Sequence, residues 1–130
     1  MDDFSAFPYA LPMLLDGGAV TNLTRAGMPA GVCMEQWAAE NPEVLKAVQT
    51  RFLQAGSTAL LAPTFGANRA CLREYGLEGA VESLNQTLIA RTRENAGGAL
   101  VGALLGPSGL FVPPDGEADF DDVYELYREQ

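Results

Sequence analysis

The chain has 130 residues, 48% of them hydrophobic, which suffices for one domain and is too few for two. Seventeen acidic residues against eight basic ones give a net charge of −9, which excludes nucleic-acid partners because their phosphates require clustered Lys and Arg. No stretch approaches the roughly 18 apolar residues of a membrane span, and acids stand where a signal peptide carries Lys or Arg, so we expect a cytoplasmic protein with one domain over residues 1–130.

The residues that usually bind zinc, His and Cys, are scarce. The chain has no histidine, the commonest zinc ligand and general base. Cys33 and Cys71 are far apart in the sequence, and neither belongs to a C-x-x-C pair. We therefore expect two free thiols and no metal site within this chain. The acids between Asp115 and Glu129 are interpreted as a solvated loop and helix face.

The first predicted element is a short buried strand at residues 13–15. It leads into Asp16, Gly17 and Gly18, where we expect a tight turn because glycine adopts backbone dihedrals that other residues avoid. The connection that follows is expected to be irregular, with Trp37 as its anchor.

The clearest helix pattern covers residues 42–55. Asn41 is a suitable N-cap, Pro42 suits the first helical position, and Gly56 ends the apolar periodicity. Residues 58–62 then form an uninterrupted apolar and β-branched run. Such a run is typical of a parallel strand that is covered on both faces.

Two further helices are predicted, a short one over residues 67–75 and a longer one over residues 78–96. The longer helix has an apolar stripe formed by Val81, Leu84 and Leu88.

A third strand is predicted over residues 99–104, followed by a loop rich in Pro and Asp over residues 112–118. Asp119 is a plausible N-cap for a last helix. One face of that helix is expected to carry Phe120, Val123, Tyr124 and Tyr127, with Val123 and Tyr124 pointing inward.

The predicted strands recur about every 40 residues with helices between them, a pattern typical of βαβ units on a parallel sheet. The fold class is therefore α/β, built from parallel βα repeats. Three strands are fewer than the eight of a (β/α)8 barrel. That fold also needs about 250 residues, more than this sequence contains.

Ligands of parallel α/β folds bind at the carboxyl ends of the strands, which here are residues 16–18, 64–68 and 106–109. Asp16 could bind an ammonium group or hold its own turn together. The glycines could shape turns or offer backbone amides to a carboxylate. Asn68 could contact a ligand or begin a helix, and Arg69 could face a carboxylate or serve as a structural charge.

Short blocks along the chain carry a family pattern. They are Leu15-Asp16-Gly17-Gly18, Arg25-Ala26-Gly27-Met28-Pro29, Glu35-Gln36-Trp37, Asn41-Pro42-Glu43-Val44, Gln54-Ala55-Gly56, Pro63-Thr64-Phe65-Gly66-Ala67-Asn68-Arg69, Tyr75-Gly76-Leu77 and Gly106-Pro107-Ser108-Gly109. In order and spacing they resemble the homocysteine-binding domain of the homocysteine S-methyltransferases, most closely the amino-terminal module of cobalamin-dependent methionine synthases.

The resemblance implies the first three or so units of a (β/α)8 barrel (TIM barrel), here an incomplete one. In this family a zinc ion held by three cysteines binds homocysteine as a thiolate, which takes a methyl group from methylcobalamin, betaine or S-methylmethionine to give methionine. By position, Asp16 would hold the substrate ammonium and the Gly17-Gly18 backbone would shape the amino-acid end of the pocket. Thr64, Phe65 and Asn68 would line that pocket.

Two departures from the family pattern stand out. Val20 occupies a position where many members have glycine. The zinc cysteines of the family come from later strands, so we expect no catalytic residue and no bound cofactor in this chain, and little methyl transfer by it alone. The alternative is a non-catalytic half-barrel that binds or assembles, pairing with itself or with the remainder of a barrel through its open sheet edges.

Overall fold

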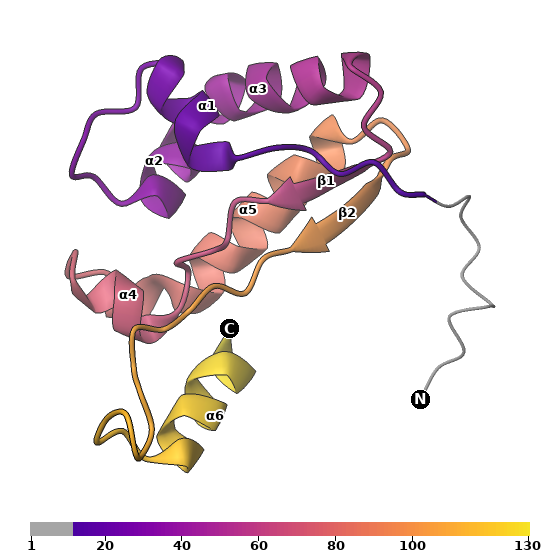
Figure 1. Cartoon of the computed structure of the whole chain (residues 1–130). Helices are drawn as coiled ribbons and strands as arrows, with labels where there is room; N and C mark the ends of the chain where they lie inside the picture. The colour runs from indigo at the N-terminus through magenta and orange to yellow at the C-terminus, as the bar shows by residue number, and fades with distance from the viewer. Residues whose placement is uncertain (1–11) are drawn as a thin grey trace.

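The computed structural model describes residues 12–130, which form helices around a small parallel sheet (Figure 1). Strands β1 (Ala59–Ala62) and β2 (Leu100–Ala103) pair in parallel, and Leu61 lies opposite Gly102. Helices occupy the connection between the two strands, which makes this a βαβ unit. The predicted α/β class and the predicted strands at residues 58–62 and 99–104 are confirmed.

The segment at residues 13–15 lies along β1 but is not a buried strand. Leu15 forms an isolated parallel bridge with Ala59, and the amide of Thr58 donates to the carbonyl oxygen of Leu14 at 2.8 Å. Leu14 is 54% exposed, because none of the described residues covers its outer side. The prediction of a buried first strand is therefore wrong in burial and in extent.

Two helices replace the stretch expected to be irregular. They are α1 (Ala19–Arg25) and α2 (Met34–Glu40). Each buries an apolar residue completely, Leu23 in α1 and Ala38 in α2, and this packing outweighs the weak local helix signal. Gly18 precedes α1 with a φ of −53°, and Gly17 has no positive φ either. The prediction of unusual backbone dihedrals at this glycine turn is therefore also wrong.

Helix α3 (Pro42–Gln54) begins as predicted, with Pro42 in its first turn, and ends one residue before the predicted bound. Asn41 is its N-cap residue by position, but the side chain does not cap α3. Instead, the Asn41 Nδ2 donates to the carbonyl oxygen of Trp37 at 2.8 Å. That carbonyl oxygen also accepts from the backbone amide of Asn41 at 2.9 Å, so Asn41 closes the end of α2 with two bonds and fixes the corner between the two helices.

The connection between the strands contains α4 (Arg69–Arg73), the 3₁₀ turn η2 (Glu78–Ala80) and α5 (Val81–Asn95). The predicted stripe of Val81, Leu84 and Leu88 is buried. Of the helices in residues 12–130, none is long and apolar enough to cross a membrane.

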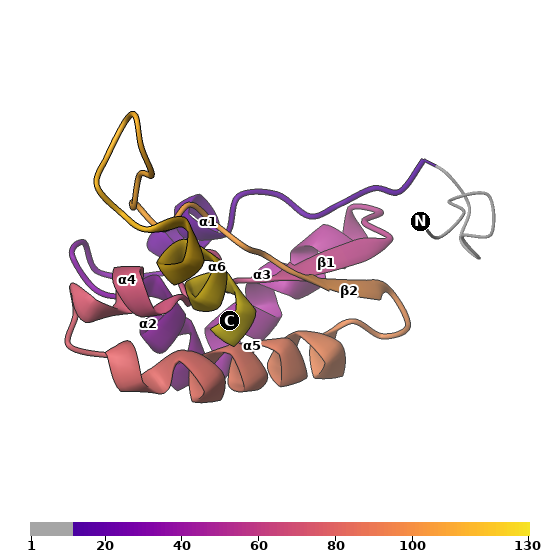
Figure 2. The same ribbon diagram turned by 90° about the horizontal axis from the view of Figure 1, so that it is seen from below.

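Helix α5 covers one face of the sheet and packs against both strands and against α3 (Figure 2). The main core lies between α1, α2, α3 and α5, and its fully or nearly fully buried residues include Leu23, Ala38, Leu45, Val48 and Leu88. A buried polar contact crosses the same interface, where the Gln49 Nε2 donates to the Thr92 hydroxyl at 3.0 Å. Each buried Leu contributes roughly 1.5–3 kcal/mol, so α3 and α5 hold the sheet in place.

The last helix, α6 (Phe120–Glu129), begins as predicted, with the Asp119 carboxylate accepting from the amide of Asp121 at 2.8 Å. Its apolar face is mostly uncovered, however, because Phe120 is 69% exposed and Tyr124 is 56% exposed. The expectation that Tyr124 points inward is therefore wrong.

Candidate functional site

The segments that follow the strands meet at the carboxyl edge of the sheet, as the sequence predicts. The Asp16 carboxylate accepts from the amide of Leu61 in β1 at 3.1 Å. The amide of Gly106, after β2, donates to the carbonyl oxygen of Phe65, after β1, at 3.0 Å. The three segments predicted to carry ligand contacts are thus connected through β1 and the loop that follows it.

Asp16 is half-buried, and burial raises the pKa of its carboxyl above the ordinary value, while the hydrogen bond from Leu61 opposes this change. Within residues 12–130 it forms no ion pair. A half-buried carboxylate of this kind gains stability from a cationic ligand, because the ligand charge offsets the desolvation of the carboxylate. Holding its own turn and binding an ammonium group are therefore compatible roles for Asp16.

Gly17 and Gly18 present exposed backbone just before α1. A Cβ at Gly17 would lie 3.0 Å from the Phe52 ring of α3, so a side chain here would crowd that helix. The carbonyl oxygen of Gly18 accepts from the Asn22 Nδ2 at 2.8 Å. The two glycines are thus held between α1 and α3, beside Asp16.

Thr64 and Asn68 are completely buried. The Thr64 hydroxyl donates to the carbonyl oxygen of Leu104 and accepts from its amide, both at 2.9 Å, so it joins the ends of β1 and β2. The Asn68 Oδ1 accepts from the amide of Cys71 at 3.0 Å and caps α4. The helix-start role predicted for Asn68 is confirmed, and both side chains have structural bonds that any ligand contact would have to share.

Phe65 is 51% exposed, the most accessible side chain of its loop. It lines a groove of about 440 Å³ between the α1–α2 connection and α4. Met28, Gly66, Cys71 and Tyr75 also line this groove. Its walls are largely apolar, and its position beside the carboxyl end of β1 fits a ligand site.

Glu35 is a residue whose structural role the sequence did not indicate. It lies on α2 and is only 6% exposed. One carboxylate oxygen accepts from the amide of Gly66 at 2.7 Å and the other from the Cys33 thiol at 3.4 Å. Burial raises the pKa of that thiol. A single glutamate in a mixed segment gives no signal for this contact, because the partner Gly66 is distant in sequence.

The described residues do not fit a zinc ion. Nowhere in residues 12–130 do three or more His, Cys, Asp or Glu side chains gather in a metal-binding arrangement. The Cys33 thiol donates a hydrogen bond to the Glu35 carboxylate, and the Cys71 thiol donates to the carbonyl oxygen of Pro107 at 3.6 Å. Arg69, considered for carboxylate binding, forms an ion pair with Glu129 of α6.

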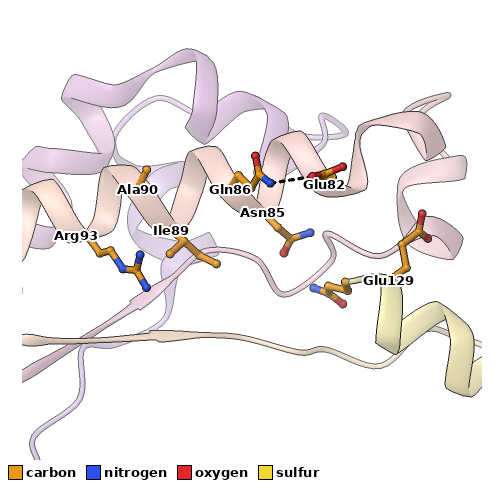
Figure 3. A pocket seen from close by; sticks show the side chains of 8 residues that line it. Glu82, Asn85, Gln86, Ile89, Ala90, Arg93 and Glu129 are labelled. Atoms are coloured by element: carbon orange, nitrogen blue, oxygen red, sulfur yellow. Dashed lines mark hydrogen bonds between the residues drawn. The ribbon is translucent and has the colours of Figure 1, made fainter.

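A second hollow, of about 560 Å³, lies between α5 and the end of α6 (Figure 3). Its lining includes Glu82, Gln86, Ile89, Arg93 and Glu129, and none of the predicted site residues is among them. Its acid Glu82 already accepts from the Gln86 Nε2 at 2.9 Å. This hollow is separate from the candidate site at the strand ends.

Parallel strands joined through helices, with the candidate ligand residues at the carboxyl ends of the strands, define an α/β protein built like part of a TIM barrel. The sequence profile of the homocysteine S-methyltransferase family matches residues 13–130. The chain therefore belongs to the homocysteine S-methyltransferase family, as the sequence blocks predicted.

A solved structure supports the same fold. The homocysteine methyltransferase MmuM from Escherichia coli, crystallised in its metallated form, superimposes with a TM-score of 0.74 at 22% sequence identity. The match covers 90% of this chain and 48% of that protein, so this chain spans about half the length of MmuM. A comparison with curated protein sequences gave no significant match.

Proposed function

We propose that this chain is the homocysteine-binding part of an S-methyltransferase that makes methionine by methyl transfer to the homocysteine thiol. The observation that carries the proposal is the position of Asp16, a half-buried carboxylate without an ion-pair partner in residues 12–130, at the carboxyl edge of the sheet. Membership of the family supplies the substrate class.

In this proposal Asp16 binds the ammonium group of homocysteine, and the exposed backbone of Gly17 and Gly18 shapes the pocket around the amino-acid end. Phe65 contributes an apolar wall. Thr64 and Asn68 support the pocket by holding its loop, because both side chains are completely buried and their polar atoms already bond to Leu104 and Cys71.

The thiol end of the substrate needs groups that residues 12–130 do not supply. The family chemistry implied by the sequence blocks uses zinc to turn the homocysteine thiol into a nucleophilic thiolate. Because the described donors do not gather into such a site, we propose that this chain binds the amino-acid end of homocysteine and is inactive by itself as a methyltransferase.

A binding experiment with a paired ligand tests this proposal. We would titrate the 130-residue chain with homocysteine and with 4-mercaptobutanoate, which lacks only the amino group, and follow both by NMR. We expect homocysteine to bind more tightly. The Asp16→Asn variant should lose this preference, since Asn can still accept from Leu61 but carries no charge.

The control for this titration is Glu40→Gln, which removes one negative charge at an exposed position on α2. Its preference for homocysteine should equal that of the wild type. If Asp16→Asn also keeps the full preference, Asp16 does not bind the ammonium group and the proposed pocket is wrong.

An assembly role is the second candidate, and the uncovered apolar surface favours it. Leu105 and Phe111, which follow β2, are 62% and 64% exposed. A half-barrel module that pairs with itself or with a complementary chain would cover such residues. Sedimentation of the purified chain decides the self-pairing form: a dimer supports it, whereas a monomer at high concentration contradicts it.

A further inference from the structure

We infer that Glu35 is a positioning residue for the ligand-side loop after β1, fixing Phe65 and Gly66 in the place where the proposed homocysteine pocket needs them. This inference rests on the proposed function for its ligand. The contact itself is a hydrogen bond from the Gly66 amide to the Glu35 Oε1 at 2.7 Å. It joins α2 to a loop 31 positions later in the chain.

The loop has one part that its own packing does not fix. Ala62, Thr64, Ala67 and Asn68 are each 0% exposed, so the interior of the molecule anchors the loop on both sides. Phe65 and Gly66 between them reach the surface. The position of these two residues therefore depends on bonds to their backbone, and Glu35 accepts from the amide of Gly66.

The contact is close enough to select the residue types on both sides. A Cβ at Gly66 would lie 2.9 Å from the Glu35 Oε1, so a larger residue would push the carboxylate away. The second carboxylate oxygen accepts at 3.4 Å from the thiol of Cys33, the residue just before α2, and this bond holds the Glu35 side chain in place. A charge-assisted bond from a backbone amide to a buried carboxylate is stronger than a neutral one.

The same loop is linked onward to the segment after β2. The Phe65 carbonyl oxygen accepts from the amide of Gly106 at 3.0 Å, and a Cβ at Gly106 would lie only 2.4 Å from that oxygen. Displacing Gly66 would therefore move the Phe65 carbonyl against Gly106. Through Glu35, helix α2 sets the positions of two of the ligand-side loops.

The test compares Glu35→Gln, Glu35→Ala and Glu40→Ala. Glu35→Gln keeps an oxygen that accepts from the Gly66 amide and has an amide group that reaches Cys33, whereas Glu35→Ala removes both contacts. Glu40→Ala is the control, because it removes an exposed acid from the same helix. The first readout needs no ligand: hydrogen exchange of the Gly66 amide, measured by NMR. We expect fast exchange in Glu35→Ala, near wild-type exchange in Glu35→Gln and no change in Glu40→Ala.

The second readout is homocysteine affinity, corrected for the folded fraction of each variant. We expect about tenfold weaker binding by Glu35→Ala, because ordering the loop becomes a cost of binding, and recovery of most of the affinity by Glu35→Gln. A role in stability alone would lower the folded fraction and leave the corrected affinity unchanged, which would overturn the inference.

The two proposals fail in different ways. If the wild-type chain does not bind homocysteine, the proposed function is wrong, and Gly66 exchange still decides whether Glu35 positions the loop. If Glu35→Ala does not fold, the decision falls on Glu35→Asp, which keeps the charge but is one methylene too short for the 2.7 Å contact with the Gly66 amide: faster Gly66 exchange and weaker homocysteine binding support the role, and wild-type exchange overturns it. Equal Gly66 exchange in wild type and a folded Glu35→Ala overturns it.

Discussion

Replacing Thr64 with Val tests whether the hydroxyl of this residue joins the two strands. Val has nearly the same shape, so the packing of a completely buried site is retained while the hydroxyl is lost. The amide of Leu104, 2.9 Å from that hydroxyl, then loses its partner, and the carbonyl oxygen of Leu104 keeps only the Gln130 Nε2 as a donor, at 3.5 Å. An unpaired buried group costs about 1–3 kcal/mol, and because Leu104 is only partly buried we expect about 1–2 kcal/mol.

The assay is urea unfolding followed by circular dichroism, together with hydrogen exchange of the Leu104 amide. With a urea dependence of about 2 kcal/mol per molar, within the usual range for small proteins, the midpoint should fall by roughly 0.5–1 M. Thr64→Ser is the matched variant: it loses one buried methyl, about 1 kcal/mol, and keeps the hydroxyl. Leu104 should exchange quickly in the Val variant alone. An amide that stays protected in Thr64→Val would refute the reasoning.

Three further predictions follow from buried or crowded positions. Leu88→Ala should lower the free energy of unfolding by about 2–5 kcal/mol, measured by urea unfolding, since Leu88 is completely buried between α3 and α5. Gly106→Ala should lower the thermal midpoint because its Cβ would lie 2.4 Å from the Phe65 carbonyl oxygen, whereas an equal midpoint would show that the loop yields freely. Burial raises the folded-state pKa of Asp16, so the wild type is favoured below the unfolded pKa and loses that stability as the pH rises through the folded pKa. Asp16→Asn cannot ionise, so its stability relative to the wild type should increase between about pH 3 and pH 7, and a constant difference in unfolding experiments would contradict this.

Much of the fold could be predicted because the local signals agree with the packing. The Pro42 start of α3, the stripe of α5 and the two strands at residues 58–62 and 99–104 all have patterns that match their burial. Helices α1 and α2 were missed because they are short and each depends on a single fully buried residue, which no periodicity can reveal.

The candidate site was predictable only in part. Its location after the strands follows from the parallel topology, so the segments that carry Asp16 and Phe65 could be named in advance, while the individual roles in the pocket come from the family resemblance. The contact of Glu35 with Gly66 could not, because it joins positions 31 apart whose residue types are common in loops and helices. The exposure of Tyr124 was also missed, since an amphipathic pattern shows that a face is apolar without showing what covers it.

The two cysteines differ in a way that gives the chain a chemical handle. The thiolate is the form of cysteine that reacts with alkylating reagents. Cys33 is buried and hydrogen-bonded to Glu35, and burial raises the pKa of its thiol. Cys71 is partly accessible and lines the groove beside Phe65. A fluorescent or fluorinated label should therefore attach first at Cys71, where it would report ligand entry into the groove without any engineered residue.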